Sequence, residues 1–207
     1  GMLDWLYLVP EDKDSLKLRL GDGNGFGAES SFDLKLSSFP THLTSKPSKG
    51  SQRFCSIDAV SNEALIFSFE KRSKNNPDET WKVQSYDLFS ESNKQAAWAM
   101  DDFDGNGWSD LVVSDSSLGE LLFLPGKPHG QFGSAQEVPS LRGVSALHPI
   151  RVGKKRSPSL LILSRDEEAL GLANFDKKGP FSFPDMIPTT GSPLVAVSTD
   201  CDSDGVE

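Results

Sequence analysis

A repeat of 49 residues runs through the second half of the chain and constrains the fold more than any other feature. Asp102, Arg151 and Asp200 are equally spaced (151 − 102 = 49 and 200 − 151 = 49). Phe132 and Phe181, each in a glycine-containing turn, have the same separation. A period of about 40 to 50 residues with several short strands is typical of a propeller blade or a related array. The sequence therefore predicts an all-β fold, a β-propeller built from repeated sheets.

Each repeat is predicted to be a four-stranded blade, and the 207 residues allow about four blades. The predicted units are residues 4–50, 51–92, 93–141 and 142–190, with 191–207 completing the first blade. In the clearest unit the strands are expected at 97–100, 110–115, 120–124 and 136–140. The next unit repeats this order at 146–150, 159–164, 170–174 and 184–187. An earlier unit is expected to have its strands at 54–58, 65–70, 80–84 and 86–89.

The two ends of the sequence complement each other. Residues 4–9 match the second strand of the clearest unit, with no first strand before them. Residues 194–197 match a first strand, followed by the start of an acidic loop. Pairing of these segments would complete one blade and close a ring. A closed monomer is therefore expected, and a homodimer sharing a ring of about eight blades is the alternative.

The loop after the first strand of the clearest unit has the spacing of a cation site. Four acceptors occupy its positions one, three, five and nine: Asp102, Asp104, Asn106 and Asp110. Alternate residues of a curled loop point inward, so these oxygens can converge, and the backbone carbonyl of Trp108 would add another. Gly107 at position six can adopt the positive φ that the turn needs. The predicted cation is Ca²⁺.

The surroundings of this loop are not those of an EF-hand. An EF-hand has a glutamate at position twelve and a helix on each side, whereas this loop has Val113 there and strand-like flanks. The sequence therefore predicts a strand-loop-strand calcium site. The alternative is a solvated turn of aspartate, asparagine and glycine without a metal.

A second acidic loop begins one repeat later. Asp200, Asp202 and Asp204 have the spacing of the first three ligands, which predicts a second calcium site. The ninth position would have to come from elsewhere, and Asp4 is the candidate if the two ends meet. An acidic tail without a metal is the alternative.

The repeat between these two loops has lost its carboxylates. Arg151, Lys155 and Ser159 stand where ligands would be, so no metal is expected there. The cationic side chains are expected to pair with neighbouring carboxylates or carbonyls. A contact with an anion or an acidic glycan is the functional alternative.

Composition excludes several classes of partner. The net charge of −9 argues against nucleic acid, because no broad basic face offsets it. No apolar run reaches the ~18 residues that a membrane span needs. Cys55 and Cys201 lack the spacing of a zinc site, so buried free thiols are expected.

The sequence predicts no catalytic residue. His42, His129 and His148 are scattered, and none stands in a zinc-protease motif. The tryptophans and the repeated phenylalanines could stack on sugars, although packing between blades is the expected role. The tryptophans considered for these roles are Trp5, Trp81, Trp98 and Trp108.

The repeats resemble those of a known family. The pattern Asp-x-Asp-Gly-Asn-Gly-x-x-Asp-Leu-Val-Val, followed by a Gly-x-Phe-Gly turn, is similar to the FG-GAP/VCBS repeats of integrin-like β-propellers. The match is specific over residues 97–140, weaker over 146–187 and 194–207, and weakest before residue 89. The resemblance implies that the calcium loop joins the two innermost strands of a blade. It also implies that ligands approach the opposite face.

The resemblance further implies an extracellular, periplasmic or cell-surface setting and a role in binding or adhesion. The expected function is a calcium-stabilised module that recognises a protein or a glycan. One alternative is a propeller-type polysaccharide lyase, in which cations would neutralise a uronate carboxylate while a base removes the neighbouring proton. Another is a scaffold within a larger protein.

Overall fold

The computed structural model describes most of the chain. It covers residues 4–9, 12–21, 23–33, 42–48, 51–58, 63–70, 82–87, 97–115, 118–128, 131–153, 157–176 and 179–199, with the backbone alone for 42–48, 51–58, 63–70 and 82–87. These residues form fifteen strands in four antiparallel sheets and contain no α-helix. No helix that could cross a membrane therefore occurs among them. The predicted all-β class is confirmed.

The third and fourth sheets are meanders with the same layout. The third consists of β8 (Trp98–Asp101), β9 (Asp110–Asp115), β10 (Glu120–Leu124) and β11 (Gln136–Pro139). The fourth consists of β12 (Val144–Ile150), β13 (Ser159–Ser164), β14 (Ala169–Ala173) and β15 (Asp185–Ile187). The last three strands of one sheet begin 49 residues before those of the other. The predicted strands of both units are confirmed to within about two residues.

The first two sheets agree less closely with the prediction. The first has three strands, β1 (Trp5–Leu8), β2 (Leu16–Gly21) and β3 (Phe26–Phe32). The second contains β4 (His42–Ser48), β5 (Ser51–Asp58), β6 (Glu63–Glu70) and β7 (Lys82–Asp87). The predicted boundary between residues 50 and 51 falls inside the β4–β5 hairpin, and the two strands predicted within 80–89 are one strand. No strand was predicted at 42–48, because proline at position 47 disfavours one. The strand β4 forms there because it lies at a sheet edge, where proline is tolerated.

The core of the described residues lies between the third and fourth sheets. Val112 and Leu121 from the third sheet belong to the same buried cluster as Leu160 and Ile162 from the fourth. Phe181 of the fourth repeat packs against the third sheet, because its ring lies edge-on to that of Phe123 with the ring centroids 5.7 Å apart. Each such side chain contributes about 1.5–3 kcal/mol by leaving water. The prediction that a repeated phenylalanine packs between neighbouring sheets is confirmed for Phe181.

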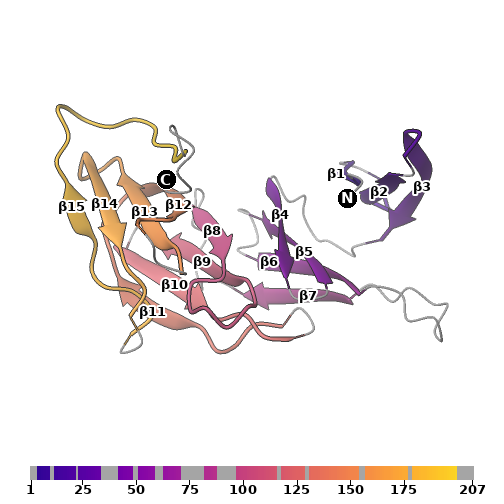
Figure 1. Cartoon of the computed structure of the whole chain (residues 1–207), viewed down its shortest axis with the longest axis horizontal. Coiled ribbons are helices and arrows are strands. Elements are labelled where there is room, and N and C mark those ends of the chain that lie inside the picture. Colours follow the sequence, from indigo (N-terminus) through magenta and orange to yellow (C-terminus); the bar gives the residue numbers. More distant parts are fainter. Residues whose placement is uncertain are drawn as a thin grey trace.

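The ring expected from the sequence is not closed in this structure. The four sheets follow one another in Figure 1, with β1–β3 at one end and β12–β15 at the other. Among the described strands, β1 pairs with β2 alone. The predicted strand at 194–197 is wrong, because that segment forms no strand and Leu194 and Val195 are 70% and 76% exposed. A strand needs a partner for its backbone groups, and residues 194–197 take part in no ladder with a described strand.

Candidate metal centre

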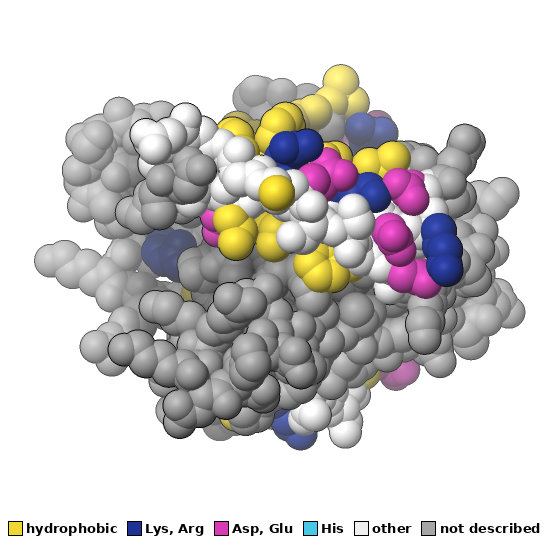
Figure 2. Space-filling model, turned by 90° about the vertical axis from the view of Figure 1, so that its right-hand side faces the viewer, with side chains coloured by type: hydrophobic (Ala, Val, Ile, Leu, Met, Phe, Trp, Pro, Cys, Tyr) yellow, Lys and Arg dark blue, Asp and Glu magenta, His cyan; other side chains and the backbone are white. Residues whose placement is uncertain are grey.

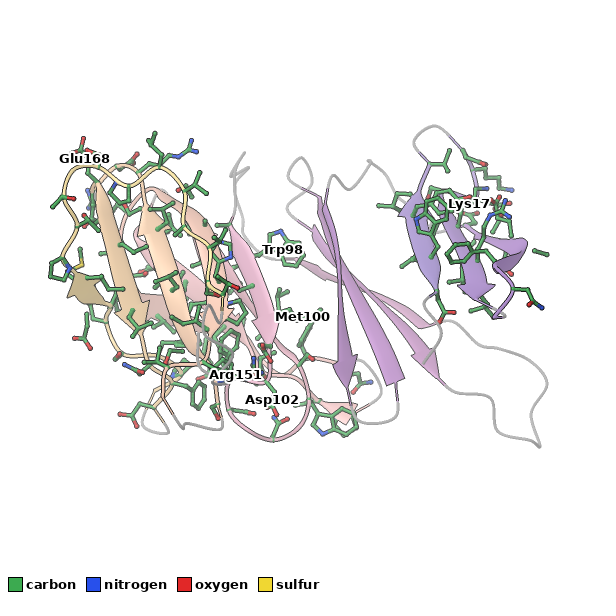
Figure 3. The ribbon with its side chains drawn as sticks, turned by 45° about the horizontal axis from the view of Figure 1, so that its top comes forward. Lys17, Trp98, Met100, Asp102, Arg151 and Glu168 are labelled. Carbon is green, nitrogen blue, oxygen red and sulfur yellow. The ribbon has the colours of Figure 1, made fainter. Side chains whose placement is uncertain are left out.

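The acidic loop joins two neighbouring strands of the third sheet. Asp101, the last residue of β8, pairs with Asp110, the first residue of β9, so the eight residues between them form the loop. Phe103 is fully buried and anchors the loop in the core beneath it. Asp102 therefore starts the loop directly beyond the strand end, where Figure 3 shows it. Asp102 and Asp104 flank Phe103 on either side in the sequence and are less buried than it is.

Asp110, at the start of β9, is the most enclosed of the carboxylates at this site. Its Oδ2 accepts hydrogen bonds from the backbone N–H groups of Phe103 at 2.8 Å and Asp104 at 3.3 Å. Its Oδ1 accepts one from the N–H of Gly126 at 2.6 Å. Burial nevertheless raises the pKa of Asp110 to about 7, and the nearby carboxylate of Asp104 adds to this shift. The hydrogen bonds oppose the shift without cancelling it, so positive charge at the site would favour the ionised form of this group.

Asp102 offers an oxygen that has no partner. Its Oδ2 accepts a hydrogen bond from the N–H of Gly107 at 2.8 Å. Its Oδ1 is buried and receives no hydrogen bond. Burial raises the pKa of Asp102 as well, and repulsion from Asp104 contributes. A buried carboxylate oxygen without a donor costs free energy unless a ligand binds it.

Three carboxylates converge at this place. Asp102, Asp104 and Asp110 each present one oxygen, and these oxygens lie within 4.8 Å of one another. This is the one group of three or more His, Cys, Asp or Glu side chains with metal-binding geometry in the described part of the chain. Oxygen-only donors suit a hard divalent cation. The residues present therefore fit a metal ion, and three predicted ligands are brought together as expected.

Asn106 and Trp108 complete the turn. Asn106 donates from Nδ2 to Asp104 Oδ2 at 2.7 Å and to the carbonyl of Gly126 at 3.3 Å. Its Oδ1 accepts a hydrogen bond from the N–H of Trp108 at 2.7 Å. Ligation by Asn106 and by the Trp108 carbonyl stays a prediction. The positive φ predicted for Gly107 is confirmed, at 87°.

Gly126 is a part of the site that the sequence reasoning missed. A Cβ on Gly126 would lie 2.2 Å from the carbonyl oxygen of Ser109, which shows how closely its backbone approaches the loop. Gly126 also forms hydrogen bonds with Asp110 and Asn106. The close backbone approach and these hydrogen bonds hold the acidic loop against a turn that is distant from it in the sequence. A proline and a glycine directly after β10 were the available signal. They indicated a turn and not the place where it packs.

The corresponding loop of the fourth sheet carries a cation. Arg151 Nη2 lies 3.8 Å from Asp101 Oδ2, the carboxylate that immediately precedes the acidic loop. Figure 3 shows Arg151 close to Asp102 at the same end of the sheets. The predicted pairing of this cation with a neighbouring carboxylate is confirmed. Asp101 was not predicted as the partner of Arg151. Two consecutive aspartates in the sequence do not show which of them faces a neighbouring cation and which belongs to the acidic loop.

The other predicted residues are not among the three converging carboxylates or lie outside the described residues. Ser159 is buried in β13 and donates to Asn174 Oδ1 at 2.9 Å. Trp98 is half-buried on β8, so its predicted place in the core is met in part. The following candidates lie outside the described residues: Trp81, His129, Lys155, Asp200, Cys201, Asp202 and Asp204. Cys55 and His42 are described by their backbone alone, so the expected burial of the two thiols stays a prediction.

Comparison with known proteins gives no family for this chain, so its function has to be inferred from its own residues. The chain matches no protein-family model, and it matches no curated protein.

Proposed function

We propose that the chain is a calcium-stabilised binding or adhesion module built from propeller-type blades. The observation that carries the calcium site is the buried, unpartnered Oδ1 of Asp102 beside the carboxylates of Asp104 and Asp110. A cation there would supply the missing partner and would offset the repulsion among the three carboxylates. Calcium is the ion that suits oxygen donors in a flexible loop of this size.

The proposed role of the ion is structural. A cation bound to Asp102 and Asp110 would hold the start of the loop against its end, next to the pair that joins β8 to β9. It would also hold the turn at Gly126, because Gly126 donates to Asp110. Metal binding that requires the folded arrangement adds its free energy to folding. The folded protein is therefore expected to be more stable with calcium than without it.

The binding role is supported by the repeat pattern. Gly105 and Gly107 of the loop, with φ of 75° and 87°, have the turn conformation that the Asp-Gly-Asn-Gly sequence predicts. Together with the repeated strands, this agrees with the resemblance to FG-GAP/VCBS repeats. That resemblance supports an extracellular or cell-surface setting and a protein or glycan ligand. The net charge of −9 makes a nucleic acid an unfavourable partner.

Thermal unfolding with calcium and with a chelator tests the metal site. Calcium is expected to raise the melting temperature of the unmodified protein. Asp102→Asn is expected to remove most of this increase, because it removes one of the converging charges. Asp185→Asn, an exposed carboxylate on β15, makes the same change in net charge and is expected to keep the increase. Equal melting curves with calcium and chelator, for protein first stripped of metal, would contradict the proposal.

Binding and turnover are separated by a second measurement. The calcium-loaded protein is screened against immobilised glycans and purified extracellular proteins, and soluble glycans are examined for new unsaturated ends. Retention of a ligand without cleavage supports the module. Release of unsaturated sugars would favour the polysaccharide lyase over the binding module. If no glycan or protein is retained, the proposed binding role is contradicted.

A further inference from the structure

One face of the first sheet combines aromatic and charged side chains. Paired residues of neighbouring antiparallel strands point to the same side, so the register of β1–β3 defines the two faces. Trp5 pairs with Arg19, which pairs with Glu29, and Tyr7 pairs with Lys17. We call this side, with Phe26, the aromatic face.

The aromatic rings of this face form an exposed cluster. Trp5 lies 5.6 Å from Tyr7 and 5.6 Å from Phe26, measured between ring centroids, and its ring is tilted by 47° to each. Trp5 is 55% exposed and Phe26 is 50% exposed. Leaving two large rings in water forgoes the stabilisation that burial would give. The cluster is therefore available for a ligand.

Charged side chains beside the rings are already held in pairs. The Tyr7 hydroxyl donates a hydrogen bond to Glu29 Oε2, which also accepts from Arg19 Nη2 at 3.2 Å. Lys17 Nζ lies 2.7 Å from Asp12 Oδ2. Figure 2 shows this mixture, with hydrophobic side chains among basic and acidic ones on the side of the molecule that carries β1–β3. These charged side chains, which we call the rim of the aromatic face, are polar, and their charges balance to about zero.

This composition differs from the surface that one sheet uses to bind another. The third and fourth sheets meet through alanine, valine, leucine, isoleucine and phenylalanine. On the first sheet, the apolar face is the opposite one, which carries Leu6, Leu8 and Leu18 together with the fully buried Leu16. The aromatic face is therefore not built as a sheet-packing surface, and a second copy of the chain is a poor occupant for it.

We propose that the aromatic face binds a neutral pyranose sugar, as part of a glycan. A pyranose ring has a C–H face that can stack on the Trp5 ring and an edge of hydroxyls that can reach Arg19 and Glu29. Charges that are balanced within the rim favour an uncharged sugar. The net charge of −9 further disfavours an acidic one. This inference rests on the proposed binding role and assigns it a site and a ligand class.

Affinity electrophoresis in gels containing soluble polysaccharides tests the site. The probes are a β-glucan, a galactan and a mannan as neutral polymers, and a polygalacturonate as the acidic one. The protein is expected to be retarded by a neutral polymer and not by the polygalacturonate. Trp5→Ala and Phe26→Ala are each expected to weaken binding at least about tenfold, which is about 1.4 kcal/mol. Leu118→Ala is the control, because Leu118 is 64% exposed and lies outside the first sheet, and it is expected to bind as the unmodified protein does.

Further measurements keep the outcomes distinct. Trp5→Phe retains a ring, so it is expected to bind better than Trp5→Ala, and the calcium-dependent melting temperature shows whether each variant is folded. The inference is overturned if no neutral polymer binds, if the acidic polymer binds preferentially, or if Trp5→Ala and Phe26→Ala leave binding unchanged. It is also overturned if light scattering shows dimers that Trp5→Ala dissociates. A glycan or protein bound elsewhere would preserve the binding module while removing this site.

Discussion

Phe181 of the fourth sheet's last connection lies edge-on to Phe103 of the acidic loop, with ring centroids 5.2 Å apart and ring planes at 75°. Both rings are buried, at 6% and 0% exposure. The loop that gathers the carboxylates is thus held from below by a residue of the next repeat. The packing between the third and fourth sheets and the geometry of the acidic loop are therefore coupled.

Phe181→Ala is expected to lower the free energy of unfolding by about 3–5 kcal/mol, because it leaves a cavity beneath the loop. Calcium affinity is expected to fall as well, since Phe103 loses the ring that supports it. Phe183→Ala, two residues away and 58% exposed, is the matched control and is expected to change stability by less than about 0.5 kcal/mol. Urea unfolding and calorimetric titration with calcium measure both effects, and similar losses in the two variants would contradict the coupling.

Gly126→Ala is expected to distort the acidic loop. The added Cβ would meet backbone atoms of Ser109 at 2.2 and 2.7 Å, and backbone cannot swing aside as a side chain can. The expected cost is about 1–3 kcal/mol of unfolding free energy, together with weaker calcium binding. Gly179→Ala provides the comparison, because nothing lies within 4 Å of its Cβ position. Unchanged stability in Gly126→Ala would show that the turn is not held against the loop.

The pKa of Asp110 gives the metal-free protein a defined pH dependence. Burial raises this pKa from 3.8 to about 7, so between those values the folded state holds a proton that the unfolded state releases. The contribution of Asp110 therefore makes the free energy of unfolding fall as pH rises from about 4 to about 7, with no further change above. Below pH 7 calcium must displace the proton, and its apparent affinity is expected to fall by about tenfold per pH unit. Calorimetric titrations at about pH 5.5 and about pH 8, in buffers of different ionisation enthalpy, count the released protons. Equal affinity at both values would contradict the shift.

Arg151→Gln is expected to lower the free energy of unfolding by about 0.5–1 kcal/mol, because its partner Asp101 is buried while the guanidinium is half exposed. Arg165→Gln removes the same charge from an exposed turn and serves as the control. The difference between the variants is expected to shrink in about 1 M salt, as screening weakens the remaining attraction. Chemical denaturation at low and high salt measures it, and identical curves would show that Arg151 acts only through net charge.

The repeat pattern predicted the parts of the fold whose cause is local. The strands of the third and fourth sheets were found because short apolar runs and turn residues recur at fixed spacing. Asp102, Asp104 and Asp110 were found because a curled loop places alternate residues on one side. Gly126 and Asp101 were not found, since their roles depend on which turn packs against the loop. The ring closure predicted for residues 194–197 is absent, because matching sequences at two ends do not bring those ends together.

The contact between Arg151 and Asp101 bears on how the third and fourth sheets would respond to the ions around them. The positive charge of Arg151 is covalently attached and cannot be lost by dilution, whereas an ion at Asp102 would have to be taken from the medium. If the acidic loop binds a divalent ion as proposed, a shortage of such ions would weaken the hold on that loop and leave the pairing of Arg151 with Asp101 in place. The weakened place would then be a loop within the third sheet, in the interior of the sequence.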